Sequence, residues 1–135
     1  KEIAGKQTVN FNISHSGEFI LEGFAVGMDI GVDVQEMAGC PDYREIAGNF
    51  YTAEEAEDVI NEGPELFFQY WAAKEAYVKA IGIGLGRGMD FFSVRNGEIT
   101  EKGRKGQGWH LYPVKIEGYA AYVAAHKKGD KSNEL

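Results

Sequence analysis

Cysteine is nearly absent from this chain, which has one, Cys40, among 135 residues. One thiol can form neither an internal disulfide nor a metal site built from several cysteines. Basic residues are also outnumbered, with 14 lysines and arginines against 21 acids and a formal net charge of −7. Because nucleic-acid binding needs clustered Lys and Arg, we expect no nucleic-acid partner. The low cysteine content fits a reducing compartment, so we predict a cytoplasmic protein.

Long apolar runs are missing as well. The most apolar window, residues 19–34, is interrupted by acidic residues and several glycines. We therefore expect neither a membrane-spanning segment nor a secretory signal, and no membrane partner. The length suits one domain, which we assign to residues 1–128, followed by a polar tail at 129–135.

Hydrophobic periodicity predicts an α+β fold, in which two to three helices pack on a mainly antiparallel sheet. Helices are expected at residues 52–61 and 65–81, the first opened by the capping-box pair Thr52 and Glu55. The expected strands are residues 8–13, 18–26, 28–35, 90–95, 98–100, 109–116 and 119–126. The expected connections are a turn at 14–17, a loop with room for a short helix at 37–49, a glycine-rich connector at 82–88 and a hairpin turn at Asn96-Gly97.

The predicted strand 28–35 carries the first group of candidate site residues. Its alternation turns one side apolar and leaves Asp29, Gly31, Asp33 and Gln35 on the other. Two carboxylates and an amide therefore line one face of the strand, and Gly31 leaves room for a bulky ligand to approach the backbone. A turn-capping role for Asp33 is the alternative.

The predicted helix 65–81 carries the second group. Trp71, Glu75 and Lys79 are four residues apart and form one stripe, with Lys74 beside it. Glu75 and Lys79 match the ordinary pair that stabilises helices, so a solvated helix face is one interpretation. The other is that Glu75 joins Asp33 in binding a hard divalent cation such as Mg²⁺, which prefers carboxylate oxygens.

Three segments in order, residues 12–17, 31–35 and 71–79, resemble the signature motifs of 4′-phosphopantetheinyl transferases. The closest type in this respect is the one that activates surfactin synthetase, the Sfp type. The resemblance implies half of a pseudo-twofold, two-lobed fold. Residues 1–27 resemble the end of the N-terminal half of that type, and residues 28–128 resemble its C-terminal half.

The activity implied by the resemblance is transfer of the phosphopantetheine arm of coenzyme A to a serine of an apo acyl or peptidyl carrier protein, with Mg²⁺. The residues that it implies are Asp33, Gln35 and Glu75 for the metal, Ser14, His15, Lys74 and Lys79 for the coenzyme, and Glu75 and Lys79 for catalysis. Gln35 occupies a position that is often Glu in the family, so we expect weaker or differently tuned Mg²⁺ binding. The general base would be Glu75 or a water held by the metal.

Within these implied roles, Ser14 and His15 would contact the 3′-phosphate of the coenzyme, and Lys74 would lie near the coenzyme or carrier surface. An exposed turn histidine is the alternative for His15. Basic side chains that could face an acidic carrier are Arg87, Lys102, Arg104 and Lys105, for which a solvated loop is the alternative.

Members of the Sfp type have two similar halves with coenzyme A between them. Because the chain begins with Lys1 and the motif at 12–17 belongs to the long type, we expect a missing N-terminal half. The alternative is self-association, as in the short trimeric holo-acyl-carrier-protein synthases. The rival function is a catalytically impaired fragment or a module that binds Mg²⁺, nucleotide or carrier protein without transfer.

Overall fold

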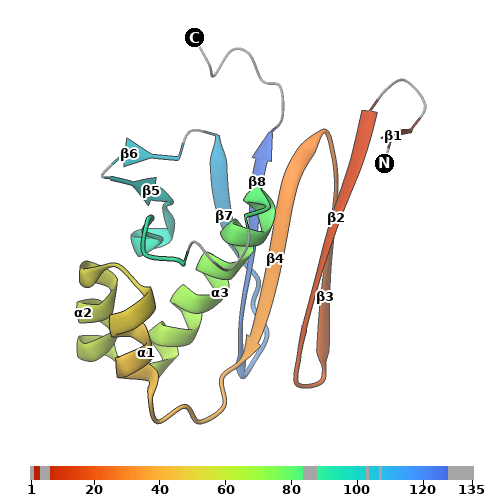
Figure 1. The fold of residues 1–135 in the computed structure, drawn as a ribbon. Helices are drawn as coiled ribbons and strands as arrows, with labels where there is room; N and C mark the ends of the chain where they lie inside the picture. Colours follow the sequence, from red (N-terminus) through yellow and green to blue (C-terminus); the bar gives the residue numbers. More distant parts are fainter. Residues whose placement is uncertain (1, 4–6, 84–87, 103, 107, 128–135) are drawn as a thin grey trace.

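A three-stranded antiparallel sheet, in the order β4-β8-β7, supports the long helix α3 (Figure 1). These elements are β4 (Met28–Glu36), β8 (Tyr119–Lys127), β7 (Trp109–Pro113) and α3 (Pro64–Ile81). The structure is a computed structural model that describes residues 2–3, 7–83, 88–102, 104–106 and 108–127. The long helix packs on this antiparallel sheet, in agreement with the predicted α+β fold class.

Two shorter helices, α1 (Tyr43–Phe50) and α2 (Ala53–Glu62), pack beside α3. The predicted capping box begins α2: the Thr52 side chain accepts from the Glu55 amide, and the Glu55 carboxylate accepts from the Thr52 amide, both at 3.1 Å. Helix α1 fills the segment expected to be a loop with room for a short helix. None of the helices in the described part of the chain combines the length and the hydropathy needed to cross a membrane.

The predicted hairpin at the start of the chain forms from β2 (Gln7–Ser16) and β3 (Phe19–Val26), with a short β1 (Glu2–Ile3) pairing on β2. The expected turn at 14–17 is wrong, because β2 continues through Ser16. The chain reverses instead at Gly17, whose φ of +54° is easiest for glycine.

The hairpin lies along β4 (Figure 1), but β2 and β4 do not share a backbone ladder. Alternate polar side chains of β2 bond the β4 backbone instead. The contacts are Asn10 Nδ2 to Met28 O, Val32 N to Asn12 Oδ1 at 2.9 Å, Val34 N to Ser14 Oγ at 3.1 Å and Glu36 N to Ser16 Oγ at 2.8 Å. These side chains satisfy amide and carbonyl groups on the outer edge of β4.

The expected strand at 90–95 is wrong, and the one expected at 98–100 begins only at Thr100. Ser93 and Thr100 form an isolated bridge, and residues Arg95–Gly97 form a 3₁₀ turn in which Asn96 has a φ of +59°. Two short strands follow, β5 (Thr100–Glu101) and β6 (Arg104–Lys105). The strands expected at 109–116 and 119–126 are confirmed as β7 and β8, with β7 ending earlier, at Pro113. Most of the glycine-rich connector and the polar tail lie outside the described residues.

Candidate functional site

Gly31 lets helix α3 lie directly against strand β4. A Cβ atom at Gly31 would overlap the carbonyl oxygen of Ala76 and lie 2.6 Å from the amide nitrogen of Ala80. The space that the sequence suggested for a ligand is therefore filled by α3, so that prediction is wrong. The close approach brings the helix positions next to Ala76 and Ala80, namely Glu75 and Lys79, to the acidic side of β4.

Asp33 on β4 lies at the centre of this contact, with 5% of its surface exposed. Its Oδ1 accepts from Ser14 Oγ at 3.3 Å, and its Oδ2 accepts from Gln35 Nε2 at 2.8 Å. Burial raises the pKa of Asp33 from 3.8 to about 6. The nearby Glu75 carboxylate also raises this pKa, which places the two acids within electrostatic range of each other.

Glu75 and Lys79 face this carboxylate from α3. Burial raises the pKa of the half-buried Glu75, and the positive charge of Lys79 opposes the rise. Lys79 Nζ donates to Val32 O at 2.7 Å and to Ile13 O at 2.9 Å, so it ties α3 to both β4 and β2. A lysine ammonium has three donors, and two of the three are used here.

The structure therefore brings together five of the predicted site residues: Ser14, Asp33, Gln35, Glu75 and Lys79. The carboxylates suit a hard cation, because two acids held close together while partly buried repel each other unless a positive charge lies between them. Among the described residues, no group of three His, Cys, Asp or Glu side chains is placed to hold a metal. The donor set on offer is two carboxylates and one amide.

Lys74 does not join this group. Its side chain is fully buried and pairs with Glu55 Oε1 at 2.7 Å. The Lys74 ammonium also donates to Phe92 O and lies 4.1 Å from the centre of the Phe92 ring. Burial lowers the pKa of Lys74, and Glu55 opposes this shift. The expectation that Lys74 lies near a coenzyme or carrier surface is therefore wrong, because its charge is used inside the core.

His15 and Ser14 also separate. Successive strand residues point to opposite sides, so Ser14 faces β4 while His15 is exposed on the other side of β2. The sequence-based alternative, an exposed turn histidine, is half right, since His15 is exposed but lies within a strand. The contact of Ser14 with Asp33 was missed, although the alternation of Asn10, Asn12, Ser14 and Ser16 was a visible signal.

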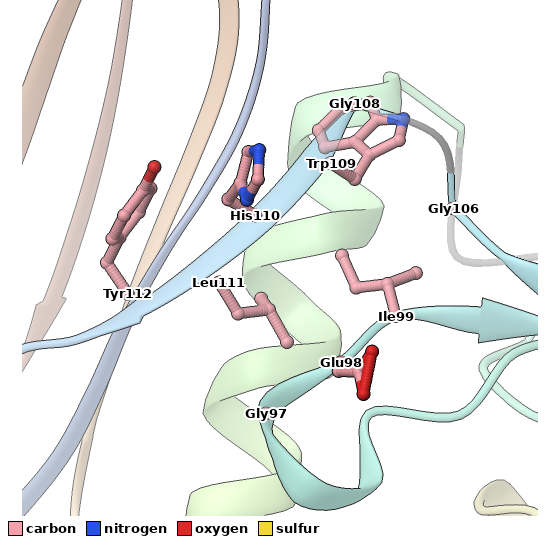
Figure 2. Close-up of a pocket in the computed structure, with 9 residues that line it drawn as sticks. All are labelled: Gly97, Glu98, Ile99, Gly106, Gly108, Trp109, His110, Leu111 and Tyr112. Carbon is pink, nitrogen blue, oxygen red and sulfur yellow. The ribbon is translucent and has the colours of Figure 1, made fainter.

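A separate groove lies between β7 and the segment around Ile99, as Figure 2 shows. Its volume is about 590 Å³. The lining residues are Gly97, Glu98, Ile99, Gly106, Gly108, Trp109, His110, Leu111 and Tyr112. It contains none of the predicted site residues, so the candidate chemistry is not located there.

Solved structures of holo-acyl-carrier-protein synthases share this fold. The holo-acyl-carrier-protein synthase of Thermotoga maritima gives a TM-score of 0.55 at 19% identity, covering 74% of this chain and 63% of that chain. The synthase of Bacillus anthracis, solved in complex with coenzyme A, gives 0.52 at 21% identity, covering 75% of this chain and 96% of that chain. These likenesses confirm the predicted α+β fold.

Residues 29–125 match the sequence profile of the 4′-phosphopantetheinyl transferase superfamily. The chain belongs to this superfamily. Among its relatives, the 4′-phosphopantetheinyl transferase Sfp of Bacillus subtilis is 36% identical over 90 residues, which cover 64% of this chain and 39% of Sfp. The human L-aminoadipate-semialdehyde dehydrogenase-phosphopantetheinyl transferase is 31% identical over 146 residues, which cover 91% of this chain and 47% of the human protein.

The resemblance to the Sfp type is thus confirmed. The superfamily match includes β4, α3 and β8, the elements that carry Asp33, Glu75 and Lys79. The chain spans about a third to a half of the length of the curated relatives that it matches.

Proposed function

We propose that the chain takes part in transfer of the 4′-phosphopantetheine arm of coenzyme A to a serine of an apo acyl or peptidyl carrier protein. The observation that carries the proposal is the convergence of Asp33, Glu75 and Lys79 at the contact between β4 and α3. Superfamily membership gives this cluster its chemical meaning, since the reaction moves the phosphopantetheine group from a phosphate oxygen of coenzyme A to a serine oxygen.

Asp33 and Glu75 would hold Mg²⁺, with Gln35 beside them. Mg²⁺ in proteins is commonly bound by one or two carboxylates together with the phosphates of a substrate, so this donor set fits the ion. When bound, Mg²⁺ would supply a positive charge to the diphosphate of coenzyme A. Gln35 supplies an amide where a third carboxylate is often found, which supports the expectation of weaker or differently tuned binding.

Glu75 and Lys79 would carry the transfer itself. The serine hydroxyl of the carrier attacks the phosphorus that bears the pantetheine arm, and its proton passes to Glu75. The bond from that phosphorus to the bridging oxygen breaks, and adenosine 3′,5′-bisphosphate leaves. In the metal-free protein, burial raises the pKa of Glu75, so this carboxylate takes up a proton more readily than an exposed acid. The remaining N–H of Lys79 would donate to a phosphate oxygen.

The coenzyme also needs contacts beyond this cluster, and His15 is the exposed imidazole we propose for the 3′-phosphate. Around it, the hairpin exposes a group of large apolar side chains: Phe11, Ile13, Phe19, Ile20, Phe24 and Val26. We propose that this face is covered by a further half of the polypeptide, in line with the expectation that 1–27 and 28–128 belong to two halves of one fold. A second copy of the chain is the alternative, and the molar mass in solution distinguishes the two.

The acidic carrier would meet local basic side chains. Lys102, directly after β5, and Arg104, on β6, are exposed. Arg87 lies outside the described residues, and the side chain of Lys105 is not described. The cytoplasmic location stays a prediction, supported by the low cysteine content.

Mass spectrometry tests the proposal directly. The protein is incubated with coenzyme A, Mg²⁺ and an apo carrier protein, and the carrier should gain the mass of the phosphopantetheine arm. Glu75→Ala should slow the gain by at least about 100-fold, because general acid–base groups contribute that much or more. The matched control is Glu65→Ala, which removes an exposed acid from the first turn of the same helix and should keep the parent rate.

The outcomes separate the two functions. If Glu75→Ala modifies the carrier as fast as the parent, the role of Glu75 is wrong. If the parent binds coenzyme A and Mg²⁺ but transfers nothing, the chain is a binding module. The short span relative to the relatives, together with Gln35, is the observation that favours this second function.

A further inference from the structure

Ser14 lies between two groups of strand β4. Its hydroxyl oxygen accepts from the amide of Val34 at 3.1 Å, and its hydroxyl hydrogen is directed to Asp33 Oδ1 at 3.3 Å. Only 9% of the residue is exposed. A serine hydroxyl has one hydrogen to donate, and here the acidic oxygen of Asp33 is its acceptor.

The second oxygen of Asp33 is fixed from the other side, by Gln35 Nε2 at 2.8 Å. A carboxylate that accepts at both oxygens has its plane set, because rotation about either χ angle breaks one of the two bonds. Groups that orient a metal ligand in this way affect metal affinity strongly, although they never touch the metal.

We propose that Ser14 is a positioning residue that orients the Asp33 carboxylate, and that it makes no contact with the 3′-phosphate of coenzyme A. This inference rests on the proposed function, since it gives Asp33 a metal to bind. Ser14 reaches Asp33 because every second side chain of β2 points toward β4 and bonds its backbone. His15, on the opposite side of the strand, is left to meet the phosphate.

Ser16 provides a matched control for Ser14. Both are serines on the same side of β2, and each accepts from an amide of β4, Val34 for Ser14 and Glu36 for Ser16 at 2.8 Å. Of the two serines, Ser14 is the one that also donates to Asp33. Ser14→Ala and Ser16→Ala therefore both lose a bond to β4, and they should differ in what happens at Asp33.

The first measurement is the Mn²⁺ Kd in the presence of saturating coenzyme A. Electron paramagnetic resonance detects the free ion and so reports how much Mn²⁺ is bound. Ser14→Ala should raise the Mn²⁺ Kd by about tenfold, in line with the loss of other groups that orient a metal ligand. Ser16→Ala should stay within about twofold of the parent, and Ser14→Thr, which keeps the hydroxyl, should restore most of the affinity. If Ser14→Ala does not fold, Ser14→Cys, with its weak S–H donor, takes its place.

The second measurement compares the KM for coenzyme A with that for 3′-dephospho-coenzyme A, which lacks the 3′-phosphate. Ser14→Ala should leave the ratio of the two KM values unchanged, whereas His15→Ala should bring the ratio close to one. If Ser14→Ala removes the preference for the 3′-phosphate, or its Mn²⁺ Kd equals that of Ser16→Ala, the inference is overturned. If the inference about Ser14 fails but the parent protein binds Mn²⁺ and transfers the arm, the proposed function still stands. A parent that binds no Mn²⁺ overturns both.

Discussion

The buried pair of Lys74 and Glu55 should be among the most costly sites in the protein to disrupt. Both side chains are fully buried, with 2.7 Å between Nζ and Oε1. Removing one member of such a pair typically costs about 3–5 kcal/mol, because the other charge is left buried without its partner. Glu55 also holds the amides of Thr52 and Val94, so the pair joins α2 to α3 and to the chain beyond Phe92.

Urea unfolding followed by circular dichroism measures this cost. Lys74→Met keeps the aliphatic bulk and removes the charge, so it should lower the free energy of unfolding by about 3–5 kcal/mol. With a urea slope of about 2 kcal/mol/M, in the middle of the usual range, the midpoint should fall by roughly 1.5–2.5 M. The double variant Lys74→Met with Glu55→Gln should lose about 1–3 kcal/mol less free energy of unfolding than the sum of the losses in the two single variants.

Arg95→Met is the control for Lys74→Met. Arg95 pairs with Asp58 at 2.7 Å, but its side chain is 39% exposed, so the free energy of unfolding should fall far less than for Lys74→Met. The folded Lys74→Met variant should keep the parent KM for coenzyme A. A variant as stable as the parent but with a raised KM would refute the reasoning, and would return Lys74 to the coenzyme surface.

Three further changes test the contact between β4 and α3. Gly31→Ala should cost about 3 kcal/mol or more in urea unfolding and remove transfer, because the new Cβ meets helix backbone; Gly39→Ala, whose Cβ would meet nothing within 4 Å, should cost far less. In buffer with EDTA, Asp33→Asn should stabilise the protein at pH 7 by about 2–3 kcal/mol and by less near pH 4. The reason is that the pKa of Asp33 is about 6 in the folded protein and 3.8 for an unperturbed aspartate, so the parent loses stability as the pH rises from 3.8 to 6. An equal gain in the free energy of unfolding at both pH values would contradict this reasoning. Gln35→Glu should tighten Mg²⁺ binding in calorimetry and lower the metal-free melting temperature, since it places a third acid beside Asp33 and Glu75, and a variant with unchanged affinity would remove Gln35 from the metal site.

The strand and helix that carry the site were predictable from local pattern. Period-two alternation in 28–35 and the four-residue spacing of Trp71, Glu75 and Lys79 are short-range signals, and each survives in the fold. Their closeness was not predictable in detail. Gly31 looked like space for a ligand, because a sequence does not say which neighbour uses the space that a glycine leaves.

Errors arose where the partner is distant in the chain. Lys74 pairs with Glu55, and nothing in residues 71–79 indicates that partner, so a motif lysine was expected at a surface. The sequence predicts a turn at Ser14, because polar residues next to glycine usually indicate one. Its actual partners, Asp33 and Val34, lie on another strand.

The side chains that join β2 to β4 also protect the protein against aggregation through the edge of β4. An open strand edge is a template on which another chain can add a strand, which is a common start of aggregation. Here hydroxyl and amide groups from the hairpin occupy the amides of Val32, Val34 and Glu36 without extending the ladder. A chain shortened to begin at Met28 would uncover these donors on a nine-residue strand with one apolar face, and poor solubility would follow even though the helices and the rest of the sheet were intact.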